Sequence, residues 1–301
     1  MDRAAGAREG SDTSDSGRYF RLVVEFDGSE FEGWQIQGRG ERTVQGCLKQ
    51  AAERLMGGAA QVTGSSRTDS GVHAAAMAVS LRGETDLDPE ALRRALNGVL
   101  PPDIAVLELA EASADFDVRR QARWKTYRYA IWNARERSPL RAGRWLHVRQ
   151  ALDVEAMRLA AAQLVGRHDF RSFQASGSGV TDTVRSLYRV EIQEPAPGEI
   201  VIEIEGSGFL RYMVRNLVGT LLEVARGRRR AEGIPALLAA RDRSQAGPTA
   251  APHGLTLVRV VYSPHPREVA DGRTLADSPS GRKEPAQAIA GDGVSAGKSE
   301  P

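Results

Sequence analysis

The chain has 301 residues, 41% of them apolar, and its formal net charge at pH 7 is only +2. This composition predicts a globular protein of one large domain or two smaller ones, and no apolar run approaches the ~20 residues that a membrane-spanning helix needs. A single cysteine, Cys47, excludes disulfides within the chain and cysteine-based zinc sites, and without a recognisable signal peptide we expect a cytoplasmic protein.

The two ends of the chain differ in composition from the middle. Residues 1–17 and 264–301 are rich in Gly, Ala, Ser, Asp and Pro and carry more acidic than basic side chains. They hold too few large apolar groups to offset the entropy lost on ordering, so we expect disordered tails. Nearly all the positive charge of the body between them is arginine, which RNA-binding surfaces favour but which a codon bias would also enrich. Only the positions of the arginines can separate these explanations.

The first half of the body, residues 18–112, alternates between strand and helix patterns. Residues 19–27 (YFRLVVEFD) carry apolar side chains at a period of two, which predicts a strand. Thr43 and Asp88 are suited to cap helices, and Pro89 suits a first helical position. In order, we expect a strand at 19–27, a helix at 44–56, strands at 61–65 and 75–81, a helix at 89–100 and a strand at 104–110. This is the ferredoxin-like, or split βαβ, plan.

The second half, residues 113–263, repeats this plan. In order, we expect a strand at 121–133, a helix at 153–165, strands at 184–192 and 199–205, a long helix at 210–225, a short helix at 234–240 and a last strand at 255–262. The sequence therefore predicts an α+β fold of two ferredoxin-like halves with mainly antiparallel sheets.

The connection between the two middle strands differs between the halves. In the second half this connection is a tight turn from Pro195 to Gly198. In the first half it contains the string RTDSGVHA, residues 67–74. Asp69 could serve there as an anionic nucleophile or base, kept ionised by nearby guanidinium groups, and Gly71 would let the backbone approach a ligand. A structural ion pair between Arg67 and Asp69 in a surface turn is the alternative. His73 is more suited to holding the loop than to chemistry.

A second candidate surface lies on the strand at 121–133. Its alternation places Arg123, Lys125, Tyr127 and Tyr129 on one face. A face that mixes cationic and aromatic side chains suits RNA, because cations contact phosphates and rings receive bases. An ordinary solvated strand would show the same pattern.

Five motifs, in this order and spacing, resemble the TruA family of tRNA pseudouridine synthases. They are FEGWQIQ at 31–37, RTDSGVHA at 67–74, KTYRY at 125–129, MVRNLVG at 213–219 and HGLTL at 253–257. The resemblance covers roughly residues 19–262 and implies a pseudouridine synthase fold with the catalytic cleft between its halves. It also implies the isomerisation of uridine to pseudouridine at nucleotides 38, 39 and 40 of the tRNA anticodon stem-loop.

The same resemblance assigns roles to individual residues. It makes Asp69 the essential aspartate, which either adds covalently to the uracil or sugar or removes a sugar proton to form a glycal. Arg67 would fill the gap left by the extruded base, and Tyr127 would stack on that base and assist removal of the C5 proton. Arg215 would pair with Asp69 and hold it ionised, although alone it reads as a surface arginine. Leu255 would pack beside the target base, although alone it reads as a core leucine.

The resemblance further implies a homodimer with the tRNA spanning both subunits. Five scattered histidines show no metal-ligand spacing, and we expect neither a metal nor an organic cofactor. The chain departs from the family pattern at a few positions. Ser66 and Ser70 stand where glycine and alanine are usual, which we expect to be tolerated because both are small. Arg211 and Tyr212 replace residues that are more commonly aromatic or histidine, so RNA contacts there are less certain.

Two other functions fit parts of the sequence. A non-catalytic RNA-binding module could use ferredoxin-like halves, but it would gain nothing from an anion such as Asp69 where RNA approaches. An aspartyl-phosphate enzyme would need a magnesium site of clustered carboxylates, and none lies near Asp69 in the sequence.

Overall fold

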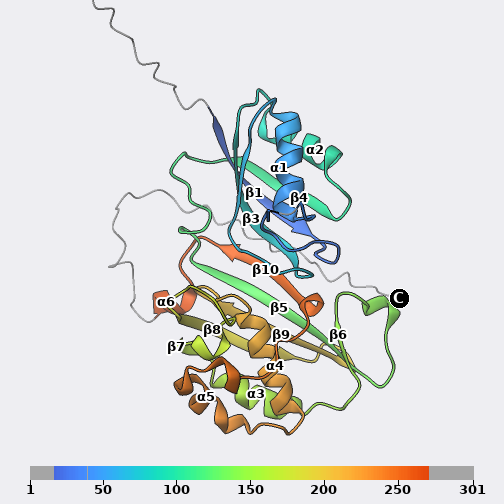
Figure 1. Cartoon of the computed structure of the whole chain (residues 1–301), viewed down its shortest axis with the longest axis vertical. Coiled ribbons are helices and arrows are strands. Elements are labelled where there is room, and N and C mark those ends of the chain that lie inside the picture. The colour runs from blue at the N-terminus through green and yellow to red at the C-terminus, as the bar shows by residue number, and fades with distance from the viewer. Residues whose placement is uncertain (1–16, 39, 271–301) are drawn as a thin grey trace, which may run out of the picture.

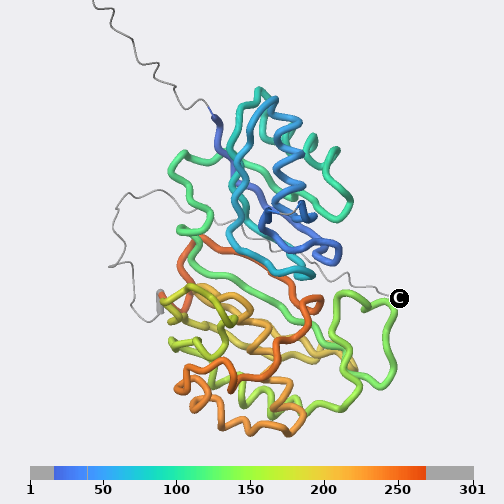
Figure 2. Tube along the Cα trace, viewed as in Figure 1, coloured from blue at the N-terminus to red at the C-terminus, as the bar shows by residue number. Residues whose placement is uncertain are grey.

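The computed structural model describes residues 17–38 and 40–270 of the chain (Figure 1). Within them the strands join into one continuous ten-stranded sheet, with helices packed against its two halves. In Figure 2 the first half, which begins in blue, lies at the top and the second half lies below it, with the chain returning in orange-red to the boundary between them. The expected tails at 1–17 and 264–301 fall almost entirely outside the described residues.

The first half has the ferredoxin-like topology that the sequence predicts. Its elements are β1 (Arg18–Phe26), α1 (Val44–Leu55), β2 (Gln61–Gly64), β3 (His73–Gly83), α2 (Pro89–Val99) and β4 (Ile104–Glu111). The spatial order is β4-β1-β3, with β2 also paired to β3, and all three pairings are antiparallel. The predicted caps are present, since the side chains of Thr43 and Asp88 accept hydrogen bonds from the backbone N–H groups of Gly46 and Ala91.

The second half repeats the topology and adds two short strands. Its elements are β5 (Trp124–Asn133), β6 (Leu146–Val148), α3 (Val154–Ala162), β7 (Gly166–Asp169), β8 (Val184–Gln193), β9 (Glu199–Gly206), α4 (Met213–Ala225), α5 (Ile234–Ala240) and β10 (Leu255–Val261). The order β10-β5-β9-β8 matches that of the first half, with β7 added at the outer edge and β6 paired to β5. The sequence did not predict β6 and β7, because three or four residues are too few for a period of two to be recognised.

The two half-sheets are joined by a parallel pairing of β10 with the start of β3. Thr256 lies opposite His73, and Leu257 lies opposite Ala74. The two β3 residues of this pairing are the last two residues of the 67–74 string. It therefore fixes the loop that carries Asp69 at the boundary between the halves.

Several boundaries differ from the sequence prediction. For example, β5 begins at Trp124 rather than at 121, and α3 ends at Ala162 rather than at 165. The long helix α4 begins at Met213 rather than at 210, because Tyr212 has a left-handed backbone conformation (φ 63°) that a helix cannot include. The second half also continues past residue 263. His265 is buried against Trp124 and Tyr188, and the short helix α6 (Pro266–Ala270) follows it.

None of the helices among the described residues is long and apolar enough to cross a membrane.

Gly219 in α4 provides a test of the packing in the second half. A β-carbon at this glycine would lie 1.7 Å from the carbonyl oxygen of Pro248, so the backbone would have to move. We expect Gly219→Ala to lower the free energy of unfolding, measured by urea denaturation, by about 2 to 3 kcal/mol.

Gly98 in α2 is the matched control, because a β-carbon there meets no atom within 4 Å. Gly98→Ala should leave stability unchanged or raise it by up to ~1 kcal/mol, since alanine restricts the unfolded chain. Equal effects of the two substitutions would contradict the packing described for α4.

Candidate active site

The loop between β2 and β3, residues 65–72, replaces the tight turn found between β8 and β9. Its backbone is held by the segment 31–37, because Trp34 N donates to Thr68 O (3.1 Å) and Gly71 N donates to Phe31 O (3.3 Å). A β-carbon at Gly33 would lie 2.7 Å from Thr68 O, so this close approach requires glycine. The FEGWQIQ motif thus supports the loop that carries Asp69.

His73 ties the end of this loop to three other segments. Gly28 N donates to its Nδ1 (3.1 Å), and its Nε2 lies 3.1 Å from Gly143 O and 3.2 Å from His253 O. The ring is 3% exposed and does not line the cleft. This agrees with the structural role expected for His73.

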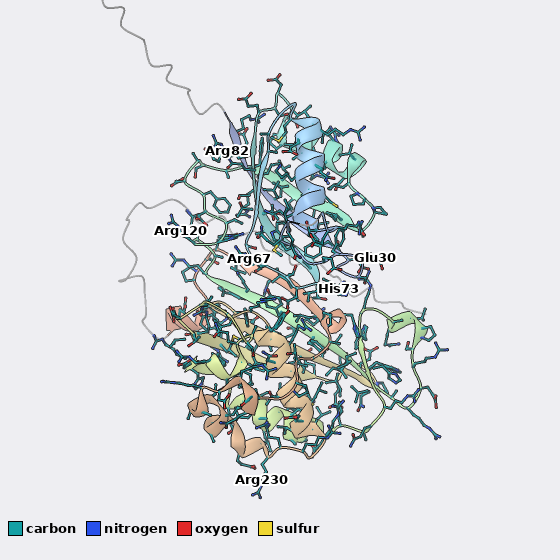
Figure 3. The ribbon with its side chains drawn as sticks, in the orientation of Figure 1. Glu30, Arg67, His73, Arg82, Arg120 and Arg230 are labelled. Atoms are coloured by element: carbon teal, nitrogen blue, oxygen red, sulfur yellow. The ribbon has the colours of Figure 1, made fainter. Side chains whose placement is uncertain are left out.

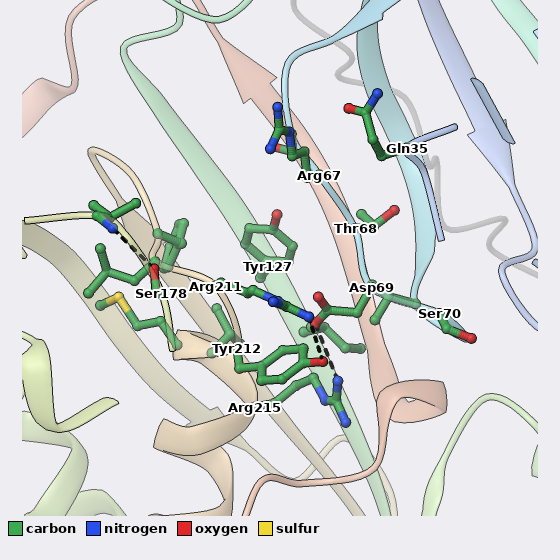
Figure 4. A pocket seen from close by; sticks show the side chains of 18 of the residues that line it. Gln35, Arg67, Thr68, Asp69, Ser70, Tyr127, Ser178, Arg211, Tyr212 and Arg215 are labelled. Atoms are coloured by element: carbon green, nitrogen blue, oxygen red, sulfur yellow. Dashed lines mark hydrogen bonds and ion pairs between the residues drawn. The ribbon is translucent and has the colours of Figure 1, made fainter. Parts of the chain in front are cut away.

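The loop forms one wall of a cleft of about 990 Å³ between the two halves (Figure 4). All six residues singled out from the sequence line it, namely Arg67, Asp69, Lys125, Tyr127, Arg215 and Leu255. They come from the 65–72 loop, β5, α4 and the start of β10. The structure therefore brings together in one place residues that lie almost 190 positions apart in the chain.

Asp69 is paired with Arg215 and not with Arg67. Arg215 Nη1 donates to Asp69 Oδ2 at 3.3 Å, and the Asp69 side chain is 22% exposed. Burial raises the pKa of Asp69 above its usual value, while the charges of Arg215 and Arg211 oppose this rise. The predicted contact with Arg215 is thus present, but it does not fully compensate for burial.

Arg67 lies apart from Asp69 on the same loop. Its side chain is exposed and is drawn above Asp69 in Figure 4, and it forms no salt bridge within the described ranges. Figure 3 shows Arg67 near the middle of the molecule, close to the boundary between the halves. The alternative of a structural Arg67–Asp69 ion pair is therefore wrong.

Tyr127 and Leu255 form an apolar part of the cleft. Tyr127 on β5 is 8% exposed and packs edge-on against Phe209, with ring centroids 5.0 Å apart. Burial and, to a smaller extent, the charge of Asp69 raise the pKa of Tyr127 to about 12, although the nearby Ser66 hydroxyl opposes the rise. Leu255 is 4% exposed where β10 begins. The phenol of Tyr127 is consequently neutral at physiological pH.

Lys125 lies two residues before Tyr127 on β5 and therefore on the same face of the strand. Its Nζ donates to Ser65 O (2.7 Å), on the loop that carries Asp69. Burial and, to a smaller extent, the charge of Arg119 lower the pKa of Lys125 to about 8. The side chain nevertheless keeps some exposure, because the cleft is open to solvent.

The strand face proposed for RNA is only partly available. Lys125 and Tyr127 line the cleft, but Tyr129 is fully buried and its hydroxyl donates to Ala251 O (2.8 Å). Arg123 precedes β5 and does not line the cleft. The prediction of a four-residue RNA face was therefore wrong for Tyr129, because the period of two does not show how far a neighbouring segment covers a strand. Arg123 itself is exposed.

Several cleft residues were not expected from the sequence. The Gly/Ser-rich loop at 177–180 lines the side opposite Asp69, and Gln174 holds it through hydrogen bonds to Ser178 Oγ (2.9 Å) and Val180 O (3.0 Å). Phe209 and Arg119 also line the cleft. Only the run SGSG could have signalled a loop here, and nothing in it indicates a ligand. No group of three or more His, Cys, Asp or Glu side chains that could hold a metal ion occurs in the part of the chain that the structure describes.

Comparison with known proteins gives consistent matches over this fold. A family model described as tRNA pseudouridine synthase matches residues 22–119 and 160–263. A protein named tRNA pseudouridine synthase A from Myxococcus xanthus is 42% identical over 254 residues, covering 84% of this chain and 96% of its own. Proteins of the same name from Geotalea uraniireducens and Pelobacter propionicus are 41% and 45% identical over 246 residues, covering 81% of this chain and 100% of their own. Among solved structures, the match to a Cbf5-Nop10-Gar1 complex covers 79% of this chain and 57% of the matched chain at 11% identity, with a TM-score of 0.33.

The lowered pKa of Lys125 predicts a pH-dependent stability. Because the folded protein binds this proton less tightly than the unfolded chain, charged Lys125 disfavours folding below about pH 8, and this cost disappears as the pH approaches 10.5. Replacing it by Met removes the cost. We expect the free energy of unfolding of Lys125→Met, relative to the original protein, to fall by about 2 kcal/mol between pH 8 and 10.5, a value reduced for the partial exposure of Lys125.

The same measurement on Lys49→Met, which removes a half-exposed lysine of α1, corrects for the loss of a lysine as such. A relative stability of Lys125→Met that stays constant over this pH range would contradict the effect of burial on Lys125.

Proposed function

Because the chain belongs to the tRNA pseudouridine synthase family, we propose that it converts uridine to pseudouridine at nucleotides 38, 39 and 40 of the tRNA anticodon stem-loop, with Asp69 as the essential catalytic residue. Membership of this family makes the chain an isomerase that acts on tRNA. The nucleotide positions rest on the family motifs alone, whereas the role of Asp69 rests on the motifs and on the geometry of the cleft.

One observation carries the proposal more than any other. The Asp69 carboxylate lies in an open cleft with a cation, Arg215, on one side and a buried aromatic ring, Tyr127, among its other lining residues. The cleft, at about 990 Å³, is at the upper end of the usual size of ligand sites and can admit an extruded nucleotide. A module that only bound RNA would gain nothing from an anion here, since RNA is a polyanion.

The target uridine has to leave its stack before it can react. Extrusion costs a few kcal/mol, and a side chain that fills the vacated space reduces this cost. Arg67 is suited to this role because its planar guanidinium can stack on bases, and because its side chain is exposed at the mouth of the cleft without a carboxylate partner among the described residues. Lys125 would contact the RNA backbone deeper in the cleft.

The reaction breaks the bond between uracil N1 and the ribose C1′ and forms a bond between uracil C5 and the same carbon. The proton on C5 is lost, and N1 gains one. Asp69 either forms a covalent bond to the uracil or the sugar or removes a sugar proton, and both routes require the carboxylate to be ionised. Arg215 favours the ionised form through its charge and its hydrogen bond.

Tyr127 and Leu255 would hold the freed uracil while it turns. The neutral phenol of Tyr127, with its pKa near 12, is a weak base. We therefore assign Tyr127 to stacking on the base and to accepting the C5 proton only if it passes on its own proton in the same step. Leu255 would pack beside the base from the start of β10.

The remaining assignments are part of the same proposal. The enzyme acts in the cytoplasm as a homodimer across which one tRNA extends, and residues 18–112 and 113–263 are its two halves, with the second extended to residue 270 by α6.

Asp69→Asn tests the chemistry. We expect this change to abolish pseudouridine formation, because the amide can act neither as nucleophile nor as base, while the affinity for tRNA changes by no more than about threefold. Mapping of pseudouridines in tRNA incubated with the purified protein measures both the activity and its position, and a binding titration measures the affinity.

Asp86→Asn, an exposed residue between β3 and α2, is the matched control and should keep full activity. An active Asp69→Asn variant would overturn the assignment of Asp69. Pseudouridine at other nucleotides would overturn the positions alone.

Light scattering tests the dimer. We expect a mass twice that of the 32.6 kDa chain, and the mass of a single chain would remove the homodimer from the proposal.

A further inference from the structure

Two arginines reach the Asp69 side of the cleft around a single aromatic ring. The guanidinium carbon of Arg211 lies 4.8 Å from the centroid of the Tyr212 ring, and that of Arg215 lies 5.0 Å from it. Arg211 Nη2 also donates to the Tyr212 hydroxyl (3.2 Å). In Figure 4 the ring is drawn between the two guanidinium groups, with the head of Arg211 beside Asp69. Both cations are thus held by one tyrosine.

The backbone at Tyr212 is unusual for a residue with a side chain. Its φ of 63° and ψ of 0° are left-handed, a conformation shared in the described ranges by only one other non-glycine residue, Arg241. Such residues are strained and collect at functional sites. Glycine would relieve the strain here but would remove the ring. The strained conformation places the ring of Tyr212 between Arg211, which precedes α4, and Arg215 in its first turn.

The contact with Arg215 is not sufficient by itself to keep the Asp69 carboxylate ionised. Arg215 Nε donates to Ala250 O (2.7 Å), and the single hydrogen bond from Arg215 to Asp69 is 3.3 Å long. Arg211 forms no salt bridge with any carboxylate in the part of the chain described, so its charge is available to Asp69. As RNA fills the cleft it displaces water and brings phosphates, and both changes favour a neutral Asp69.

We infer that Arg211 is a second cation for Asp69 and that Tyr212 is the positioning residue that aims both Arg211 and Arg215 at its carboxylate. The inference rests on the proposed function of Asp69 and extends it to two residues that act through that carboxylate. Arg211 is exposed in the free protein, so water screens its charge. Its effect is therefore largest when bound RNA has excluded that water.

The pH dependence of the reaction tests this inference. Besides Asp69 and the three residues of the inference, Arg211, Tyr212 and Arg215, other charged and titratable groups line the cleft. They are Arg67 on the Asp69 loop, Lys125 and Tyr127 on β5, Arg119 before β5 and Glu32 on the 31–37 segment. These groups stay in place in all the variants below. A shift of the acidic limb of the rate profile can therefore be assigned to the substituted residue.

With saturating tRNA, we expect Arg211→Gln to move the acidic limb of the single-turnover rate profile to higher pH by about one unit. The rate at the acidic end should then be about tenfold lower, with little change on the alkaline plateau. Arg211→Lys should restore part of the shift because it keeps the charge. Tyr212→Leu should shift the limb in the same direction. Tyr212→Phe should cause a smaller shift than Tyr212→Leu, because it keeps the ring beside both guanidinium groups and loses only the hydroxyl that accepts from Arg211.

Arg230→Gln is the matched control, because Arg230 is exposed and lies at the lower end of the molecule in Figure 3. It should leave the limb where it is. An unchanged limb in Arg211→Gln would overturn the inference, and so would a rise in KM for tRNA alone, which would make Arg211 a phosphate contact. Circular dichroism of each variant identifies any that fails to fold, and the exposed position of Arg211 provides variants that should fold.

A second readout does not depend on activity. The ¹³C titration of the Asp69 carboxylate in the free protein, identified by its absence in Asp69→Asn, should move to higher pH by about half a unit in Arg211→Gln. No movement would overturn the inference even if the enzyme is active. If the original protein forms no pseudouridine, the proposed function fails, and this titration still decides whether Arg211 acts on Asp69.

Discussion

The parallel pairing of β10 with the first residues of β3 is the contact on which the cleft depends. Only two residue pairs, Thr256 with His73 and Leu257 with Ala74, are in register there. Through them the sheet of the first half continues into the sheet of the second. Asp69 is supplied by the first half, whereas Tyr127 and Arg215 are supplied by the second. Without this pairing each half would keep its own topology but neither would contain a complete site.

Two opposing effects act on the charge of Asp69 in the cleft. A carboxylate that must act as an anion is partly buried, and burial alone favours its neutral form. The opposing contributions come from cations that are themselves oriented by the protein, through the carbonyl of Ala250 and the ring of Tyr212. Tyr127 shows the same effect of burial on an acid that does not have to ionise. Its phenol stays neutral and can provide an apolar surface for a base.

The sequence predicted local structure well and contacts between distant segments poorly. Thr43, Asp88 and Asp153 begin helices because a side-chain oxygen can accept from the free N–H groups of a first turn, and this depends only on neighbours in the chain. The same is true of the alternation in β1. The pairing of β10 with β3, the covering of Tyr129 and the left-handed Tyr212 depend on residues far away in the sequence. The six cleft residues could be predicted because they match family motifs whose members come together in the fold. The loop at 177–180 lies outside these motifs and was not predicted.

The shortness of β2 has a consequence for how the fold can vary. β2 and β10 share one edge of β3, where β2 occupies Val79–Arg82 and β10 occupies His73 and Ala74. A longer β2 would extend the hairpin along that edge, straighten residues 65–72 into a regular turn and compete with β10 for hydrogen bonds. Insertions that lengthen this hairpin would therefore have two harmful effects. A more regular sheet would separate the halves, and it would also remove the irregular backbone that positions Asp69.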